Sequence, residues 1–333
     1  CERGYYNTRK DIGYFVKNSR VDYENRIMYG DSIYFNRNKN FASATNNIQI
    51  IDTLNNSYVR GHYAEVFRNK DSVFITKRAV AITVRENDSI YIHADTLKIT
   101  GKPDRRVLRG FYKARFFKRG QPGEEPTSGK CDSIYVNERT GITKLLRNPI
   151  LWSGENQMTG DTIHLLRNIN TDKLDTLKVY NNSFVIQKDS AGFNQVKGER
   201  LIGLFTNNEL DTINIKKNTQ VIFFSRNENE ELVGINKTRR SSIKMYLKDQ
   251  EIRGIRFVKK VNGKLYPPSQ FPESARILPG FKWFGDDRLL KVNDLFRGKP
   301  APILPKIQGI PLPKKEDAFF DSSPIKYNSI PND

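Results

Sequence analysis

Apolar and polar residues alternate along most of this chain. Leu97 and Ile99 flank Lys98, and the same two-residue spacing recurs at Ile163 and Leu165. This period places alternate side chains of an extended strand on opposite faces, so that one face is buried and the other meets solvent. Helical spacing of apolar residues is not sustained over any comparable length. The pattern therefore predicts a nearly all-β protein.

The alternating segments belong to a repeated unit that opens with a small or acidic residue. The unit openings are GDSIYF from Gly30, GHYAEV from Gly61, ADTLKI from Ala94, CDSIYV from Cys131, GDTIHL from Gly160, GERLIG from Gly198 and SSIKMY from Ser241. They follow one another at intervals of 29 to 43 residues. Such a period is typical of architectures in which stacked units share one core.

Asparagine interrupts the second alternating run of several units. Because Asn tolerates positive φ and hydrogen-bonds its own backbone, these positions predict corners at which a strand bends between two walls. The predicted corners are Asn46–Asn47, Asn148, Asn181–Asn182 and Asn218. The expected fold is a stack of V-shaped antiparallel strands that encloses a trough.

The inward face of these strands supplies the candidate lining of the trough. Each candidate is the apolar member of an alternating pair in one of the repeated units. The predicted lining residues are Ile33, Phe35, Ile48, Ile50, Leu97, Ile99, Ile134, Val136, Ile163, Leu165, Ile213, Ile215, Val221, Phe223, Ile243 and Met245.

Proline ends the repeat. Of the 15 prolines, 11 lie from Pro267 onward, and proline cannot donate a hydrogen bond to a β ladder. We therefore expect a repeated β domain over 1–266 and a capping segment over 267–297, anchored by Phe281, Trp283 and Phe284. Residues 298–333 are expected to form an extended proline-rich tail, ordered only where something holds it.

Charge narrows the choice of partner more than the choice of fold. The 56 Lys and Arg against 37 Asp and Glu give a formal charge of +19, which indicates an anionic partner such as nucleic acid, a membrane surface or a phosphorylated glycolipid. The two cysteines lack metal-ligand spacing, and the three histidines lie in separate units without a recognisable nucleophile. The sequence predicts no enzyme, metal or cofactor.

Several longer segments resemble a known family. They include GYFVKNSRVDYENRIMYGDSIYF, VRGHYAEVFRNKDSVFITKRAVAIT, SIYIHADTLKITGKP, LWSGENQMTGDTIHL and FPESARILPGFKWFGDDR. From Gly13 to about Phe296 the chain resembles the OstA-like proteins of Bacteroidetes-type bacteria, relatives of the lipopolysaccharide transport protein LptA and of the periplasmic domain of LptD. The resemblance implies an open β-jellyroll whose trough holds acyl chains. It also implies further repeats upstream of the first residue.

The resemblance carries expectations about ligand, location and partners. It implies a periplasmic protein, associated with the outer membrane, that transports lipopolysaccharide across the periplasm to that membrane. The lipid A chains are expected inside the trough and the phosphorylated head group at the open edge. The basic residues expected near that edge are Arg105, Arg106, Lys113, Arg115, Arg239 and Arg240. The expected protein partners are LptC-like and LptD-like jellyrolls, or a second copy, joined by strand addition around Tyr5 to Tyr23.

Two other functions remain open from the residues alone. A basic chain with 11% aromatic residues has the composition of a groove for single-stranded nucleic acid, although the basic residues are interspersed with acidic ones. A stacked β-solenoid with a closed, dry core could equally be a scaffold or an adhesin. The interior distinguishes lipid binding from a scaffold. A trough that is open along one edge favours lipid binding, whereas a sealed core favours a scaffold.

Overall fold

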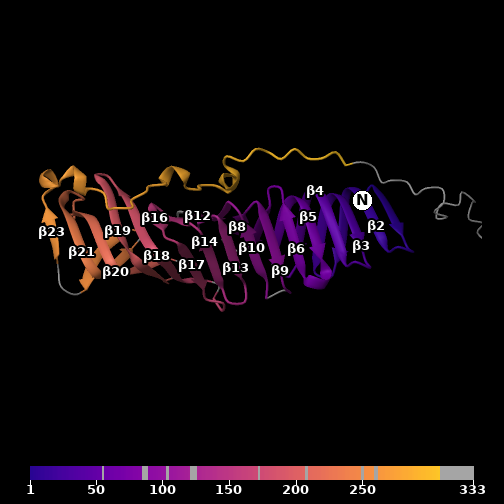
Figure 1. The fold of residues 1–333 in the computed structure, drawn as a ribbon, viewed down its shortest axis with the longest axis horizontal. Coiled ribbons are helices and arrows are strands. Elements are labelled where there is room, and N and C mark those ends of the chain that lie inside the picture. The colour runs from indigo at the N-terminus through magenta and orange to yellow at the C-terminus, as the bar shows by residue number, and fades with distance from the viewer. Residues whose placement is uncertain are drawn as a thin grey trace, which may run out of the picture.

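The prediction of an all-β fold is confirmed. The computed structural model describes residues 1–54, 56–84, 89–102, 105–120, 126–171, 173–206, 209–248, 251–258 and 262–307. Its strands join in one antiparallel sheet of 23 strands, which follow one another along an elongated molecule (Figure 1). The helical elements of these residues are short 3-10 turns, and none is long or apolar enough to cross a membrane.

The sheet forms two walls that meet along a corner. Eight long strands cross the corner and belong to both walls: β2 (Ile12–Tyr23), β3 (Arg26–Asn36), β4 (Phe41–Asp52), β5 (Ser57–Phe67), β18 (Leu174–Asp189), β19 (Gly192–Thr206), β20 (Glu209–Arg226) and β21 (Leu232–Lys248).

The remaining strands are short and belong to one wall each. The first wall contains β1 (Arg3–Asn7), β6 (Ser72–Thr76), β9 (Thr96–Thr100), β10 (Val107–Phe111), β13 (Ser133–Asn137), β14 (Ile142–Leu146), β17 (Thr162–Arg167) and β22 (Glu251–Val258). The second wall contains β7 (Val80–Val84), β8 (Ser89–His93), β11 (Ala114–Lys118), β12 (Thr127–Cys131), β15 (Ile150–Ser153), β16 (Asn156–Thr159) and β23 (Asn262–Tyr266).

Hydrogen bonding is continuous along each wall. Between the long strands β5 and β18, the first wall runs through β6, β9, β10, β13, β14 and β17. Over the same length the second wall runs through β7, β8, β11, β12, β15 and β16. The V-shaped strand is thus split at its corner in the middle of the molecule, while both walls persist.

One type of corner is a pair of residues with positive φ. The predicted asparagine corners all have this left-handed conformation. Residues without a turn preference adopt it at the equivalent positions, and the sequence reading missed these. The pairs are Lys17–Asn18, Asn46–Asn47, Lys77–Arg78, Tyr112–Lys113, Arg147–Asn148, Asn181–Asn182 and Lys217–Asn218.

The other type of corner is the small residue that opens each repeated unit. The acidic residue after it binds a positive-φ pair on the neighbouring strand: Asn47 Nδ2 donates to Asp31 at 2.8 Å, and Asn182 Nδ2 donates to Asp161 at 3.0 Å. In another unit an ion pair replaces this hydrogen bond: Lys217 Nζ lies 3.1 Å from the carboxylate of Glu199, the residue after Gly198. The repeated opening therefore specifies the corner between the walls.

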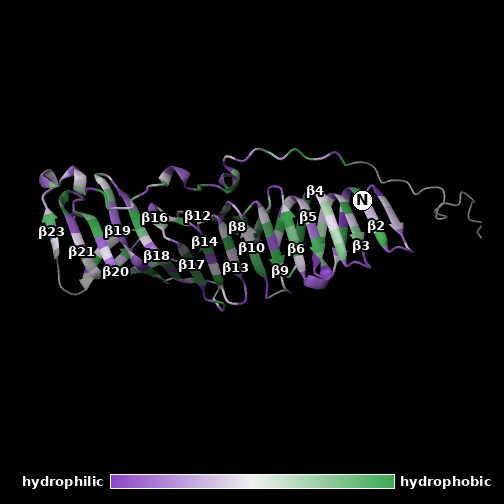
Figure 2. Cartoon of the chain, viewed as in Figure 1, coloured by the Kyte–Doolittle hydropathy of each residue, from purple (hydrophilic) through white to green (hydrophobic). Residues whose placement is uncertain are grey.

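Apolar side chains fill the space between the walls, and a second set lies outside. The main cluster contains residues from Met28 to Leu247. Figure 2 shows hydrophobic positions on strands along the length of the molecule. Two smaller clusters lie on the outer face of the second wall, one around Ile222 and Phe224 and one around Val80 and Phe117. The second wall is consequently apolar on both faces.

Residues 267–307, here named the strap, cover that outer face. The strap leaves β23 and runs back along the second wall toward the N-terminal end (Figure 1). It contains the 3-10 turns Pro268–Gln270, Glu273–Ala275, Gly285–Asp287 and Val292–Phe296. Phe281 and Trp283 pack against Phe193, whereas residues 308–333 of the expected tail lie outside the described residues.

Replacement of Gly61 by alanine tests the corner. A Cβ there would lie 2.7 Å from Ile75 Cγ1 and 2.8 Å from the Thr76 carbonyl oxygen, closer than real contacts allow. We expect Gly61→Ala to lower the free energy of unfolding by about 1–3 kcal/mol, measured by urea denaturation. Gly30→Ala is the matched control, because its nearest contact would be 3.5 Å. Equal effects of the two substitutions would contradict close packing at the corner.

Candidate functional site

The space between the walls contains a cavity of about 640 Å³ near the middle of the molecule. Both walls contribute apolar side chains to it. The first wall supplies Ile134, Val136, Leu165, Leu177, Phe205 and Leu210, and the second supplies Ile90, Ile92, Phe116, Leu151 and Met158. The cavity reaches the rim of the V, where exposed Arg139 and Ile169 also line it, so it opens to solvent. This opening separates the structure from a sealed solenoid.

Nearly all the predicted lining residues belong to the interior cluster or pack against it. Phe35 is the exception, since its ring is half-buried near the N-terminal end and packs on Tyr6 and Phe15. Of the predicted set, Ile134, Val136 and Leu165 line the cavity. The sequence reading missed the second-wall residues of the cavity because the strands there are apolar on both faces, as at Phe116 and Phe117, so that no alternation marks the inward side chains.

The six basic candidates do not come together. Arg105 lies in the exposed turn before β10, Lys113 at an exposed corner and Arg239 on the exposed part of β21 in the second wall. Arg240 lies in the same strand, but its side chain is outside the described residues. Instead, Lys118, Arg139 and Arg167 are the basic residues that line the cavity, together with Glu138. The spacing of these four charged residues in the sequence did not indicate that they lie together.

Arg106 forms an ion pair across the trough with Asp52. Arg106 precedes β10 in the first wall, and Asp52 ends β4 in the second, and their side chains are only 9% and 7% exposed. Burial, and then the charge of Arg26, lower the pKa of Arg106. A cavity of about 80 Å³ beside the pair shares Ser57, Thr83 and Glu138 with the large one. The pair thus links the two walls near the rim.

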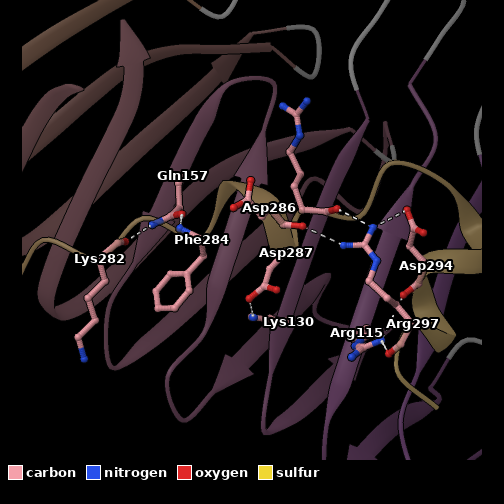
Figure 3. Close-up of polar contacts among 10 residues, drawn as sticks. Arg115, Lys130, Gln157, Lys282, Phe284, Asp286, Asp287, Asp294 and Arg297 are labelled. Carbon is pink, nitrogen blue, oxygen red and sulfur yellow. Dashed lines mark hydrogen bonds and ion pairs between the residues drawn. The ribbon is translucent and has the colours of Figure 1, made fainter. Parts of the chain in front are cut away.

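Two buried glutamines hold the backbone of the strap. Gln157 Nε2 donates to the Lys282 carbonyl at 2.8 Å, and its Oε1 accepts from the Phe284 N–H at 2.7 Å (Figure 3). Gln195 makes the same pair of bonds with the Arg276 carbonyl and the Leu278 N–H, at 2.7 and 2.8 Å. Each side chain therefore acts as a partner strand would, and satisfies two backbone groups of an extended segment.

Arg115 binds the strap and not an open edge. Its guanidinium donates to the carbonyl oxygens of Asp294, Leu295 and Arg297 at 3.2, 3.1 and 2.8 Å. Figure 3 shows Arg115 beside Asp294 and Arg297. Burial lowers its pKa, and Lys130 forms a neighbouring ion pair with Asp287. Arg115 is thus used to hold the chain itself.

His93 ties the far part of the strap to β8. Its Nδ1 lies 2.6 Å from the Ala79 carbonyl oxygen and its Nε2 lies 2.8 Å from Lys299 Nζ, which also pairs with Asp95 at 2.6 Å. Burial lowers the pKa of His93 to about 4. At neutral pH the imidazole therefore donates from Nδ1 and accepts from the lysine at Nε2.

Other reactive groups are embedded in the fold. Burial raises the pKa of the Cys131 thiol to about 12, so the thiol is protonated at neutral pH. Burial is also the main cause that lowers the pKa values of His62 and His164. Among the described residues, no group of three or more His, Cys, Asp or Glu side chains is placed to hold a metal ion.

Comparisons with known proteins give only distant likenesses among solved structures. No protein-family model matches the chain, and no curated protein sequence matches it. Among solved structures, the chain is similar to the crystal structure of LptH, the LptA homologous periplasmic component of the conserved lipopolysaccharide transport device from Pseudomonas aeruginosa. The match has 12% identity and a TM-score of 0.30, and it covers 36% of this chain and 80% of that one. A likeness this weak does not bear on function.

Acidification should loosen the strap around His93. With the strap docked, burial lowers the pKa of His93 from 6.5 to about 4. Between these pH values His93 binds more protons when the strap is released, so docking of the strap weakens as the pH falls. Hydrogen exchange of residues 291–299, corrected for intrinsic rates, should show reduced protection at pH 4.5. His93→Gln should remove this pH dependence and His62→Gln should retain it. Unchanged pH dependence in His93→Gln would contradict the assignment.

Removal of the Asp52 carboxylate should destabilise the protein through Arg106. Breaking a buried ion pair leaves one charge uncompensated, which costs about 3–5 kcal/mol. We expect Asp52→Asn to lower the unfolding midpoint in urea, and Asp52→Asn combined with Arg106→Gln to restore much of the loss. A double variant as unstable as the sum of the single ones would show that the two residues are not coupled.

Proposed function

We propose that this chain binds the acyl chains of lipopolysaccharide in its trough and passes the lipid across the periplasm as part of a protein bridge. The observation that carries the proposal is the apolar interior, which runs from Met28 to Leu247 and opens to solvent at the central cavity. Burying acyl chains there is favourable by about 0.8 kcal/mol for each methylene. Movement along the trough needs no chemical step.

The repeated unit supports passage as well as binding. Each unit presents a similar apolar surface, as at Leu97, Ile134 and Ile163, so the lipid meets a series of sites of comparable affinity. A single deep site would trap the lipid. The head group stays outside because burial of its phosphates without partners is costly. Lys118 and Arg139, which line the cavity at the rim, are placed to meet it.

The ends of the sheet support strand addition by partners. Within the described residues, β1 pairs only with β2, and residues 19–23 of β2 pair only with β3, so both walls present an unpaired edge at the N-terminal end. LptC-like and LptD-like jellyrolls, or a second copy, are the partners that we propose at such edges. Pairing there would join two troughs into one path.

Photo-crosslinking tests lipid binding in the trough. A photoreactive amino acid at Val136 or Leu165, which line the cavity, should capture lipopolysaccharide in cells. The photoreactive amino acid in place of Tyr34 or Glu65, which lie on the outer face of the first wall, should not capture lipopolysaccharide. The crosslinked species can be identified with an antibody against the sugar chain. Equal capture at inward and outward positions would refute the proposal.

A further inference from the structure

The outer face of the first wall carries an unusual row of cations between β9 and β22. Strand register places the members of this row directly beside one another across the sheet. The row consists of Lys98, Arg109, Tyr135, Lys144, His164, Lys178, Ile202, Asn214, Lys244 and Arg256. We name this row and the outward positions next to it in the same strands the basic face.

Several cations of the basic face stand directly opposite one another. Lys98 is the cross-strand partner of Arg109, and Lys244 is the partner of Arg256. In the neighbouring row, nearer the corner, Arg200 and Lys216 form a third such pair. Like charges directly opposite on a sheet destabilise it. The three pairs therefore lower the stability of the sheet, and an anionic partner bound to this face would relieve their repulsion.

Aromatic rings hold these cations in place. Lys98 Nζ lies 4.8 Å from the centre of the Phe74 ring, and Arg109 lies 5.3 Å from that of Tyr135. The two side chains of the first pair thus lean away from each other, onto rings of the strands on either side. Lys244 Nζ lies 4.8 Å from the centre of the Tyr246 ring, two residues along its own strand. The charges are therefore presented in fixed positions along the sheet.

Acidic side chains lie at the edges of the basic face and not within it. Among the described side chains, the central row and the rows on either side contain no Asp or Glu, although the chain has 37 of them. Asp132, Asp161 and Glu199 lie along the corner, and Asp175 and Glu209 lie at the rim. A face with the average composition of the chain would carry several acids.

Exposed apolar side chains lie between the cations. Phe111, Leu204 and Tyr246 are 36%, 43% and 38% exposed, and Leu146 and Leu166 are partly exposed beside them. The strap lies on the other wall, so this face is left uncovered within the described residues (Figure 1). Ten strands give it a length of about 45 Å.

We propose that the basic face docks on an anionic phospholipid surface. Cations at fixed spacing meet the lipid phosphates, and the apolar side chains between them enter the interfacial layer, which is the arrangement that favours a membrane over nucleic acid. The inference does not depend on lipid transport, because the trough and the basic face are opposite sides of the first wall. Docking through this wall would hold the trough alongside a membrane surface.

Vesicle sedimentation with a charge-neutralised variant tests this. The variant Lys98→Gln/Lys144→Gln/Lys178→Gln/Lys244→Gln should bind vesicles of phosphatidylcholine and phosphatidylglycerol at least about tenfold more weakly than the unmodified chain. Neither protein should bind phosphatidylcholine alone. Since the variant loses repulsive pairs, its thermal unfolding midpoint should be no lower, which excludes misfolding as the cause.

The matched control removes four lysines from the other side of the molecule. Lys188, Lys264, Lys282 and Lys306 are exposed on the second wall or the strap, so their replacement by Gln gives the same net charge. This control should bind anionic vesicles as the unmodified chain does. An equal loss of vesicle binding in both variants would overturn the proposal, because net charge alone would then explain the binding. Unchanged vesicle binding with lost binding of a single-stranded oligonucleotide would assign the face to nucleic acid.

Discussion

The corner between the walls is the constraint on which the rest of this structure depends. Two sheets that packed face to face along their full width would fill the space between them, whereas walls joined at an acute corner diverge toward the rim. The corner has to be narrow, and small residues such as Gly61 allow the backbones to approach. The left-handed pair on the next strand and the acid bonded to it, as in Asn47 and Asp31, fix the angle in unit after unit.

The outer faces of the two walls differ in composition and in what covers them. The second wall is apolar outside, and the strap covers it in two ways. Buried glutamines of the wall bind strap backbone groups, and apolar strap side chains such as Leu278 and Leu295 join the two outer clusters. The first wall is basic outside and lacks such cover in the described residues. The molecule is therefore asymmetric about its trough. One side is closed by its own chain, and the other is available to a partner.

Much of this arrangement is legible in the sequence because it repeats. Period-two alternation and the openings at Gly30 or Gly160 predict strands and units, and Asn pairs predict corners. The corner at Lys77–Arg78 could not be predicted, because neither residue favours positive φ and only the register forces it. Arg106 and Arg115 appear in sequence as surface cations. Their partners, Asp52 and the strap carbonyls, are distant in the chain, so only the fold reveals that they are engaged.

Mass spectrometry of lipid extracted from the protein purified without detergent tests the central claim most directly. The claim is that the interior from Met28 to Leu247 is a lipid path and not only a core. The account predicts that a phosphorylated glycolipid with several acyl chains copurifies with the chain and is displaced by added lipopolysaccharide. A protein that is free of acyl lipid, and that takes up none when lipopolysaccharide is added, would contradict it.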